Sequence, residues 1–259
     1  MKNVVSFMTA NYVAQQTGYA MDDWPHGDRT TQEWFAPLTT FPERFGVLLS
    51  DVRALGFDAI DLWAAQLHHS WATAEHLAAA QELLEQHGLT VTSYAVRVGT
   101  DEAESVCDVA AAVGTTLIGG LAPDPRNAAP VLRERGMRLG IENHAERAPQ
   151  EIREQIGDDA DVLGTTIDTG WWATQEYDAA RAIDELHEHV FHVHLNDVFK
   201  AGEHEPCSWG DGVVPIDECL EALRRIGYDG AITVEYEPAN VDPTEACRTM
   251  LAQASLSLR

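Results

Sequence analysis

The amino-acid sequence predicts one (β/α)8 barrel domain over residues 1–259. Three observations favour this α/β fold with a parallel eight-stranded core. Eight short apolar segments alternate with segments of helical spacing, which is typical of parallel βαβ units. The chain has the length of such a barrel, ~250 residues. Four of the apolar segments end in a carboxylate or a histidine. A doubly wound sheet is the alternative, but no GxGxxG motif follows the first apolar segment.

The first half of the chain is expected to contain four strands and four helices. The strands are predicted over residues 4–8, 57–63, 89–95 and 115–119, and the helices over residues 42–55, 73–87, 102–113 and 124–135. A glycine follows each of these helices or lies just beyond it, which is a common stop signal. Residues 9–41 are aromatic-rich without a regular period and are expected to form a long irregular loop. Such a loop could line a site or pack on the barrel rim.

The second half repeats this alternation. Strands are predicted over residues 137–142, 162–168, 190–195 and 231–235, and helices over residues 149–156, 178–187, 216–226 and 243–254. A long loop around the segment WGDG (209–212) separates the seventh strand from its helix. In a barrel of this kind the active site is built at the carboxyl ends of the strands.

The charge balance is strongly acidic, with 42 Asp and Glu against 17 Lys and Arg and a formal net charge of −25. Only two residues, Lys2 and Lys200, are lysines. A negative field of this size argues against nucleic-acid and anionic membrane partners. A surface rich in carboxylates and poor in lysine indicates a halophilic source, and a merely acidic protein at ordinary salt is the alternative. We therefore expect no contact with nucleic acid or membrane.

No segment has the length of a signal-peptide core or of a membrane span, so a cytoplasmic protein is expected. The four cysteines show no CxxC pair and no metal-finger spacing; they are Cys107, Cys207, Cys219 and Cys247. Scattered cysteines in a cytosolic chain are most often free thiols. We expect two or three of them to lie on helices.

Four side chains at the ends of four consecutive predicted strands are candidate metal ligands: Glu142, Asp168, His194 and Glu235. Side chains alternate along a strand, so His192 and His194 point the same way. One acidic residue at a strand end is often only a helix cap or a turn residue. Four in register on neighbouring strands predict a site for one divalent metal. Three oxygen ligands and one imidazole favour Mn²⁺ or Mg²⁺, with Co²⁺ and Zn²⁺ as alternatives.

Several segments carry a resemblance to a known family: GFDAIDLW (56–63), IENH (141–144), IDTG (167–170), FHVHLND (191–197) and IGYDGAITVEYEP (226–238). The chain resembles the xylose isomerase-like TIM barrel superfamily, which includes sugar phosphate isomerases and epimerases and the AP endonuclease family 2. The resemblance implies that Glu142, Asp168, His194 and Glu235 bind one metal. It also implies that Glu142 and Glu235 act as acid and base on either side of an enediolate.

Five further residues are predicted to contact substrate: Asp61, His69, His144, Trp171 and Lys200. Each has a plainer interpretation as a turn, loop or packing residue. His192 could likewise be a buried core histidine or support a ligand. Two positions depart from the resembled epimerases, which often have a histidine where this chain has Trp171 and an arginine where it has Lys200. The substrate of those epimerases therefore does not carry over.

We expect an isomerase or epimerase that acts on a sugar or keto-polyol. An inosose-type dehydratase is the main alternative, because the same enediolate can expel a β-hydroxyl group. An endonuclease IV-like enzyme and a non-catalytic sugar-binding barrel are less favoured, since the ligands of a trinuclear zinc site are not evident and a binding module needs no paired glutamates. A homo-oligomer is left open.

Overall fold

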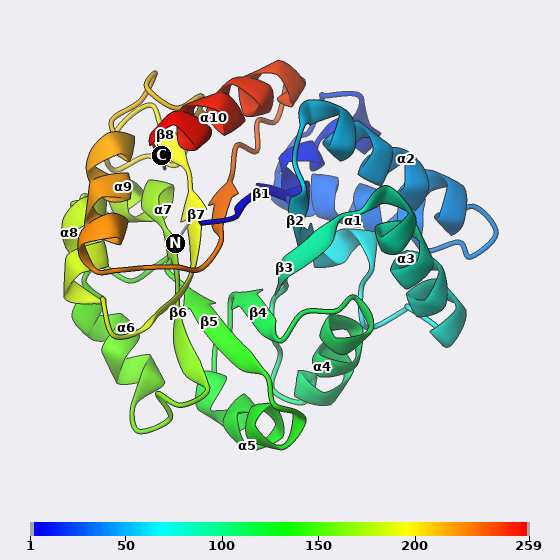
Figure 1. Cartoon of the computed structure of the whole chain (residues 1–259), viewed down its shortest axis with the longest axis horizontal. Coiled ribbons are helices and arrows are strands. Elements are labelled where there is room, and N and C mark those ends of the chain that lie inside the picture. Colours follow the sequence, from blue (N-terminus) through cyan, green and yellow to red (C-terminus); the bar gives the residue numbers. More distant parts are fainter. Residues whose placement is uncertain (1–2, 258–259) are drawn as a thin grey trace.

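Eight parallel strands close into a barrel in the computed structural model, which describes residues 3–257 (Figure 1). Around the barrel the strand order is β1-β10-β7-β6-β5-β4-β3-β2. The strands are β1 (Val5–Met8), β2 (Ala59–Trp63), β3 (Thr90–Ala95), β4 (Leu117–Gly120), β5 (Arg138–Glu142), β6 (Leu163–Asp168), β7 (Val190–Leu195) and β10 (Ile232–Val234). The predicted (β/α)8 barrel is confirmed.

Helices form a ring outside the strands (Figure 1). They are α2 (Phe41–Leu55), α3 (Ala74–His87), α4 (Ala103–Ala112), α5 (Pro125–Arg135), α6 (Pro149–Ile156), α8 (Ala179–Glu185), α9 (Ile216–Arg225) and α10 (Thr244–Ser257). In α2, Phe45, Leu49 and Val52 share one buried face at helical spacing. The helix ends at Gly56, whose φ of 103° is one that a residue with a side chain rarely adopts.

The prediction of an irregular loop over residues 9–41 was wrong in its centre. The segment contains two 3₁₀ turns, η1 (Thr9–Tyr12) and η2 (Gln15–Thr17), and a helix, α1 (Trp24–Phe35). Asp23 caps this helix by accepting a hydrogen bond from the backbone of His26 at 2.8 Å. Helix α1 packs against η3 (Ala64–Gln66), which follows β2. The aromatic segment therefore packs on the barrel rim.

Two short elements in the second half were not predicted either. Helix α7 (Thr169–Thr174) follows β6 at once, and strands β8 (Asp197–Val198) and β9 (Pro206–Cys207) form an antiparallel hairpin after β7. The Asp197 carboxylate is buried and accepts backbone hydrogen bonds at 2.9–3.2 Å from Gly210, Gly212 and Val214. One carboxylate thus holds the loop that leads to α9.

The inside of the barrel is polar. Apolar side chains such as Ile60 and Val193 alternate along their strands with inward polar ones, among them Asp61 and His192. At Gly119, a Cβ atom would lie 2.8 Å from Ser93 Oγ, so the small residues of this layer leave little room. Polar side chains this deep require hydrogen-bond partners.

Two predictions about the whole chain can be compared with the structure. All four cysteines are free and buried, and Cys107, Cys219 and Cys247 lie on helices, as predicted. Over residues 3–257, no helix combines the length and apolar character that a membrane span requires. Lys2 lies outside the described residues.

Candidate metal centre

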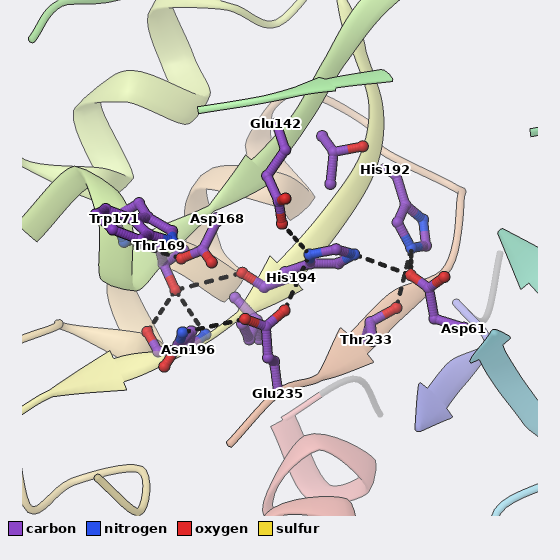
Figure 2. A network of polar contacts seen from close by, with 12 residues as sticks. Asp61, Glu142, Asp168, Thr169, Trp171, His192, His194, Asn196, Thr233 and Glu235 are labelled. Atoms are coloured by element: carbon purple, nitrogen blue, oxygen red, sulfur yellow. Dashed lines mark hydrogen bonds and ion pairs between the residues drawn. The ribbon is translucent and has the colours of Figure 1, made fainter. Parts of the chain in front are cut away.

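Four neighbouring strands bring the predicted metal ligands together at the carboxyl end of the barrel (Figure 2). Glu142 and Asp168 end β5 and β6, His194 lies near the end of β7, and Glu235 directly follows β10. Parallel pairing places Asp168 opposite His194. The backbone N–H of Glu235 donates to the carbonyl of Leu195, which carries the pairing one residue past β10.

The four side chains converge closely, with one ligand atom from each lying within 4.8 Å of the others. Nδ1 of His194 is 2.6 Å from Glu142 Oε1 and 2.9 Å from Glu235 Oε2. Oδ1 of Asp168 accepts the backbone N–H of Trp171 at 2.9 Å. Oδ2 of Asp168 is buried and finds no hydrogen-bond partner within residues 3–257. This orphaned oxygen and the dense set of carboxylates fit a bound cation.

The charged groups of the cluster strongly shift one another's pKa values. Burial disfavours the charged form of His194, but Glu235 and Glu142 outweigh this effect and raise its pKa well above the ordinary value. Burial, followed by the charges of Glu235 and Glu142, raises the pKa of Asp168 well above its usual range. Burial also acts to raise the pKa of Glu142, yet the neighbouring His194 lowers it below that range. A divalent cation would relieve the repulsion among the three carboxylates.

Two amides hold the carboxylates in place. Asn143 bonds the backbone of Asp168 twice, at 2.9 Å to its N–H and at 2.9 Å to its carbonyl. Asn196 donates from Nδ2 to Glu235 Oε1 at 3.2 Å. Each amide directly follows a strand that carries a candidate ligand. The cluster is therefore supported by short polar contacts rather than by loop packing alone.

A stack of three rings stands beside Glu142. The ring centroids of His144 and Trp171 are 4.2 Å apart, and those of Trp171 and His204 are 3.8 Å apart, with interplanar angles of 22° and 9°. Nε2 of His144 is 3.3 Å from Glu142 Oε2. Both faces of Trp171 are thus covered, so it cannot offer an aromatic face to a sugar. Only the edge of the indole remains uncovered, and the predicted contact of Trp171 with substrate stays a prediction.

Asp61 lies fully buried inside the barrel. Its side chain is 0% exposed, and its Oδ2 is 2.6 Å from His192 Nε2 and 2.9 Å from His194 Nε2 (Figure 2). Burial acts against the ionised form, but His192 and His194 lower the pKa of Asp61 to about 2. The structure places Asp61 behind the ring of a candidate ligand. Its predicted contact with substrate stays a prediction.

Comparison with known proteins identifies the family. The family model described as xylose isomerase-like TIM barrel matches residues 49–253. The chain belongs to this family. The match includes all four candidate ligands as well as Asp61, whereas β1 and α1 lie before it.

Among curated members of the xylose isomerase-like family, a D-psicose 3-epimerase of Enterocloster bolteae is 26% identical over 252 residues, covering 79% of this chain and 78% of the relative. The probable 3-DHS dehydratase AsbF of Bacillus anthracis has a similar structure, with a TM-score of 0.70 at 13% identity over 98% of this chain and 99% of the other. A zinc-bound IOLI protein aligns with a TM-score of 0.69 at 13% identity over 100% and 98% of the two chains. The two structures share the barrel with this chain.

The remaining predicted substrate residues of this xylose isomerase-like barrel lie in different surroundings. The His69 side chain is 3% exposed, stacks on His68, and has its Nε2 3.6 Å from Glu102. Lys200 is 68% exposed and pairs with Glu203 in the β8–β9 hairpin. No measurement tests either residue against substrate, so both remain predictions. Among the tryptophans near strand ends, Trp172 is fully buried and serves the core.

Two residues near the cluster were missed by sequence reasoning. Glu237 follows Glu235 by two positions; burial and the charges of Glu235, Glu142 and Asp168 raise its pKa well above the usual value. The alternation of side chains along an extended segment was the signal that could have found it. His204, in the hairpin, stacks on Trp171 beside the cluster, and partial desolvation of its ring lowers its pKa to about 4. No local pattern marks His204.

Proposed function

We propose that this chain is a divalent-metal-dependent enzyme that isomerises or epimerises a sugar or keto-polyol by moving a proton next to a carbonyl group. One observation carries the proposal: two glutamates from β5 and the end of β10 approach the same imidazole nitrogen, at 2.6 and 2.9 Å. Paired carboxylates around one point suit a reaction in which one group removes a proton and another returns it. Family membership and the epimerase relative support the same reaction class.

The metal would be held by Glu142, Asp168, Nδ1 of His194 and Glu235. Three carboxylates and one imidazole favour Mn²⁺ or Mg²⁺, with Co²⁺ and Zn²⁺ as alternatives. When bound, such an ion supplies Lewis-acid stabilisation of the negative charge that develops on a substrate oxygen. The partnerless Oδ2 of Asp168 supports the assignment, because a buried carboxylate oxygen needs a cation or a donor.

The residues of the chain supply the proton transfers. Glu142 and Glu235 act as the acid–base pair, and each is oriented by a neighbour: His144 lies against Oε2 of Glu142, and Asn196 donates to Oε1 of Glu235. Holding each carboxylate by one oxygen leaves the other directed toward the centre of the cluster. The stack of His144, Trp171 and His204 lies beside Glu142 and holds the His144 ring against its carboxylate.

A dehydratase reaction would begin with the same proton abstraction and then expel a β-hydroxyl group. His144 favours this second candidate, because a histidine beside Glu142 could donate a proton to the departing hydroxyl. The two reactions differ in product, an isomeric sugar in one case and a dehydrated ketone with released water in the other.

The test is exchange of substrate protons with solvent. The protein is loaded with Mn²⁺, incubated with a panel of ketoses and inososes in D₂O, freed of metal and followed by NMR. Loss of an α-proton signal is expected for the true substrate, and the product spectrum separates isomerisation from dehydration. Glu142→Gln and Glu235→Gln should each slow exchange by ~10²–10⁴-fold, the usual contribution of a general acid or base.

Glu203→Gln is the matched control, because it removes an exposed carboxylate of the hairpin that pairs with Lys200. It should exchange at the parent rate. If the parent protein shows no α-proton exchange on any member of the panel, the proposed chemistry is refuted. Exchange that survives in both glutamate variants at the parent rate would refute the acid–base assignment.

A further inference from the structure

The ring of His194 makes polar contacts on both of its edges (Figure 2). Nδ1 faces Glu142 and Glu235, the side on which we place the metal. Nε2 faces Oδ2 of Asp61 at 2.9 Å, on the opposite side and inside the barrel. Asp61 comes from β2, which lies outside the group of four strands that carries the candidate ligands. Its contact with His194 therefore spans the barrel.

The chemistry of this contact determines where the imidazole proton lies. An ionised carboxylate only accepts hydrogen bonds, so Nε2 of His194 must carry the proton that it donates to Asp61. In a neutral imidazole the second nitrogen, Nδ1, then has a free lone pair, which is the form that binds a metal. A carboxylate on the far nitrogen also fixes the orientation of the ring and makes the ligand nitrogen more basic.

Asp61 also makes a hydrogen bond to a second buried side chain, His192. Its Oδ2 accepts a second hydrogen bond from His192 Nε2 at 2.6 Å, and that nitrogen is 3.0 Å from the hydroxyl of Thr233. The Thr233 hydroxyl is 2.7 Å from that of Ser6. All of these side chains are 0–1% exposed, so the chain of contacts runs through the barrel interior away from solvent.

We propose that Asp61 is a positioning residue for the metal centre: it accepts a hydrogen bond from the Nε2–H of His194 and so directs Nδ1 toward Glu142, Asp168 and Glu235. His192 acts through Asp61 rather than as a ligand. This inference rests on the proposed function, because it presupposes that His194 binds a metal. It assigns a task to two buried residues that the acid–base mechanism leaves unused.

A second metal held by Asp61, His192 and His194 is the competing arrangement, because their nitrogen and oxygen atoms also lie close together. The separations of 2.6 and 2.9 Å are those of hydrogen bonds donated to a carboxylate. Each of the two nitrogens points at the same oxygen. Because only one carboxylate lies on this side of the ring, against three around Nδ1, the charge balance favours a hydrogen-bonded triad over a second ion, and the number of ions bound separates the two.

The decisive measurement is made on the parent protein. With ¹⁵N-labelled histidine and one equivalent of Zn²⁺, long-range ¹H–¹⁵N correlations should show His194 protonated at Nε2 and bound to zinc through Nδ1. His194→Ala identifies the signals by their loss. Zinc on Nε2, or a proton on Nδ1, would overturn the inference, as would binding of two equivalents of Zn²⁺ per chain.

Variants measure the size of the effect. Asp61→Asn removes the charge at constant shape and should weaken Mn²⁺ binding by ~10–100-fold, the usual cost of losing such a partner. Ser93→Ala is the matched control, since Ser93 pairs with Asp61 in the β2–β3 register, is equally buried, and has no hydrogen-bond partner in the described part of the chain. Its Mn²⁺ affinity should stay within twofold of the parent (~2-fold is the scatter of such binding measurements).

The outcomes distinguish this inference from the function on which it rests. Unchanged Mn²⁺ binding in a folded Asp61→Asn protein overturns the positioning role while leaving the metal centre intact. Unchanged binding in His194→Ala removes the metal centre itself. If Asp61→Asn does not fold, the proton position measured on the zinc-loaded parent decides the question alone.

Discussion

The two halves of the barrel differ in what their strand ends carry. Strands β5, β6, β7 and β10 bring four charged side chains to one point at the carboxyl end. Strands β2, β3 and β4 instead direct Asp61, Ser93 and Gly119 inward, where they pack tightly below that point. The first group offers atoms for chemistry, and the second offers one buried carboxylate within a tightly packed layer. A barrel can thus confine reactivity to half of its rim and use the other half for support.

The largest effect is expected when each of the two histidines of β7 is replaced by alanine in turn. His194→Ala removes a candidate ligand and should lower Mn²⁺ affinity by more than ~100-fold, the upper end for losing even an outer partner. His192→Ala removes contacts to Asp61 and Thr233 but no candidate ligand, and should cost less. Metal content and binding isotherms at matched folding measure both, and equal, full occupancy in the two variants would break the comparison.

Acidity provides the next test. Burial acts to lower the pKa of His194, but Glu235 and Glu142 raise it well above its ordinary value, so the metal-free protein keeps a proton on the ring to a higher pH than a free imidazole would. Below that raised pKa a metal must displace this proton, so affinity should fall as pH falls, by up to ~10-fold per unit. Mn²⁺ titrations at several pH values between 6 and 8 measure the slope. A flat profile would contradict proton competition at the cluster.

The stack of rings on Trp171 can be tested separately from the candidate metal ligands. His204→Ala removes one ring of the stack on Trp171 and should raise KM by roughly 3- to 10-fold, the equivalent of losing one aromatic contact of ~1 kcal/mol. Metal affinity should not change, because His204 is not a candidate ligand. Steady-state kinetics on the substrate found by proton exchange provide the measurement, and His187→Ala, at an exposed position on the helical side, is a suitable control.

The smallest expected effect concerns the surface rather than either half of the barrel. With a net charge of −25, the protein should be more stable in molar KCl than at 0.1 M, because salt screens repulsion among surface carboxylates. The thermal midpoint is expected to rise by several degrees (about 1 kcal/mol shifts it by ~2–4 °C at this size). A midpoint that stays constant or falls would argue against the halophilic interpretation.

Regular periodicity explains why most of the fold could be predicted from the sequence. The bounds of β7 and α6 were predicted as they occur, because an apolar strand and a proline-led amphipathic helix leave local signals. Helix α1 was missed because glycine, threonine and aspartate within it resemble loop composition. Its packing against η3, a long-range contact, favours the helix over its weak local propensity.

The residues of the candidate site likewise divide into those that the sequence predicts and those that it does not. Glu142, Asp168, His194 and Glu235 were identifiable because strand ends of a parallel barrel meet, so local pattern and topology together specify the cluster. The position of Asp61 behind His194 depends on a contact across 133 residues of sequence, and strand alternation alone does not determine how deep its carboxylate lies. His204 depends on a hairpin whose strands are two residues long.

The β8–β9 hairpin has a consequence for how the surface beside Trp171 can change. Its tip, residues 199–205, carries His204 to the rim, while Asp197 anchors the following loop through three backbone contacts outside the tip. Residues 199–205 can therefore be replaced together without changing Asp197 or the four strand ends. Under the proposed function, replacement of these few residues would change the surface beside Trp171 and leave the candidate metal ligands in place.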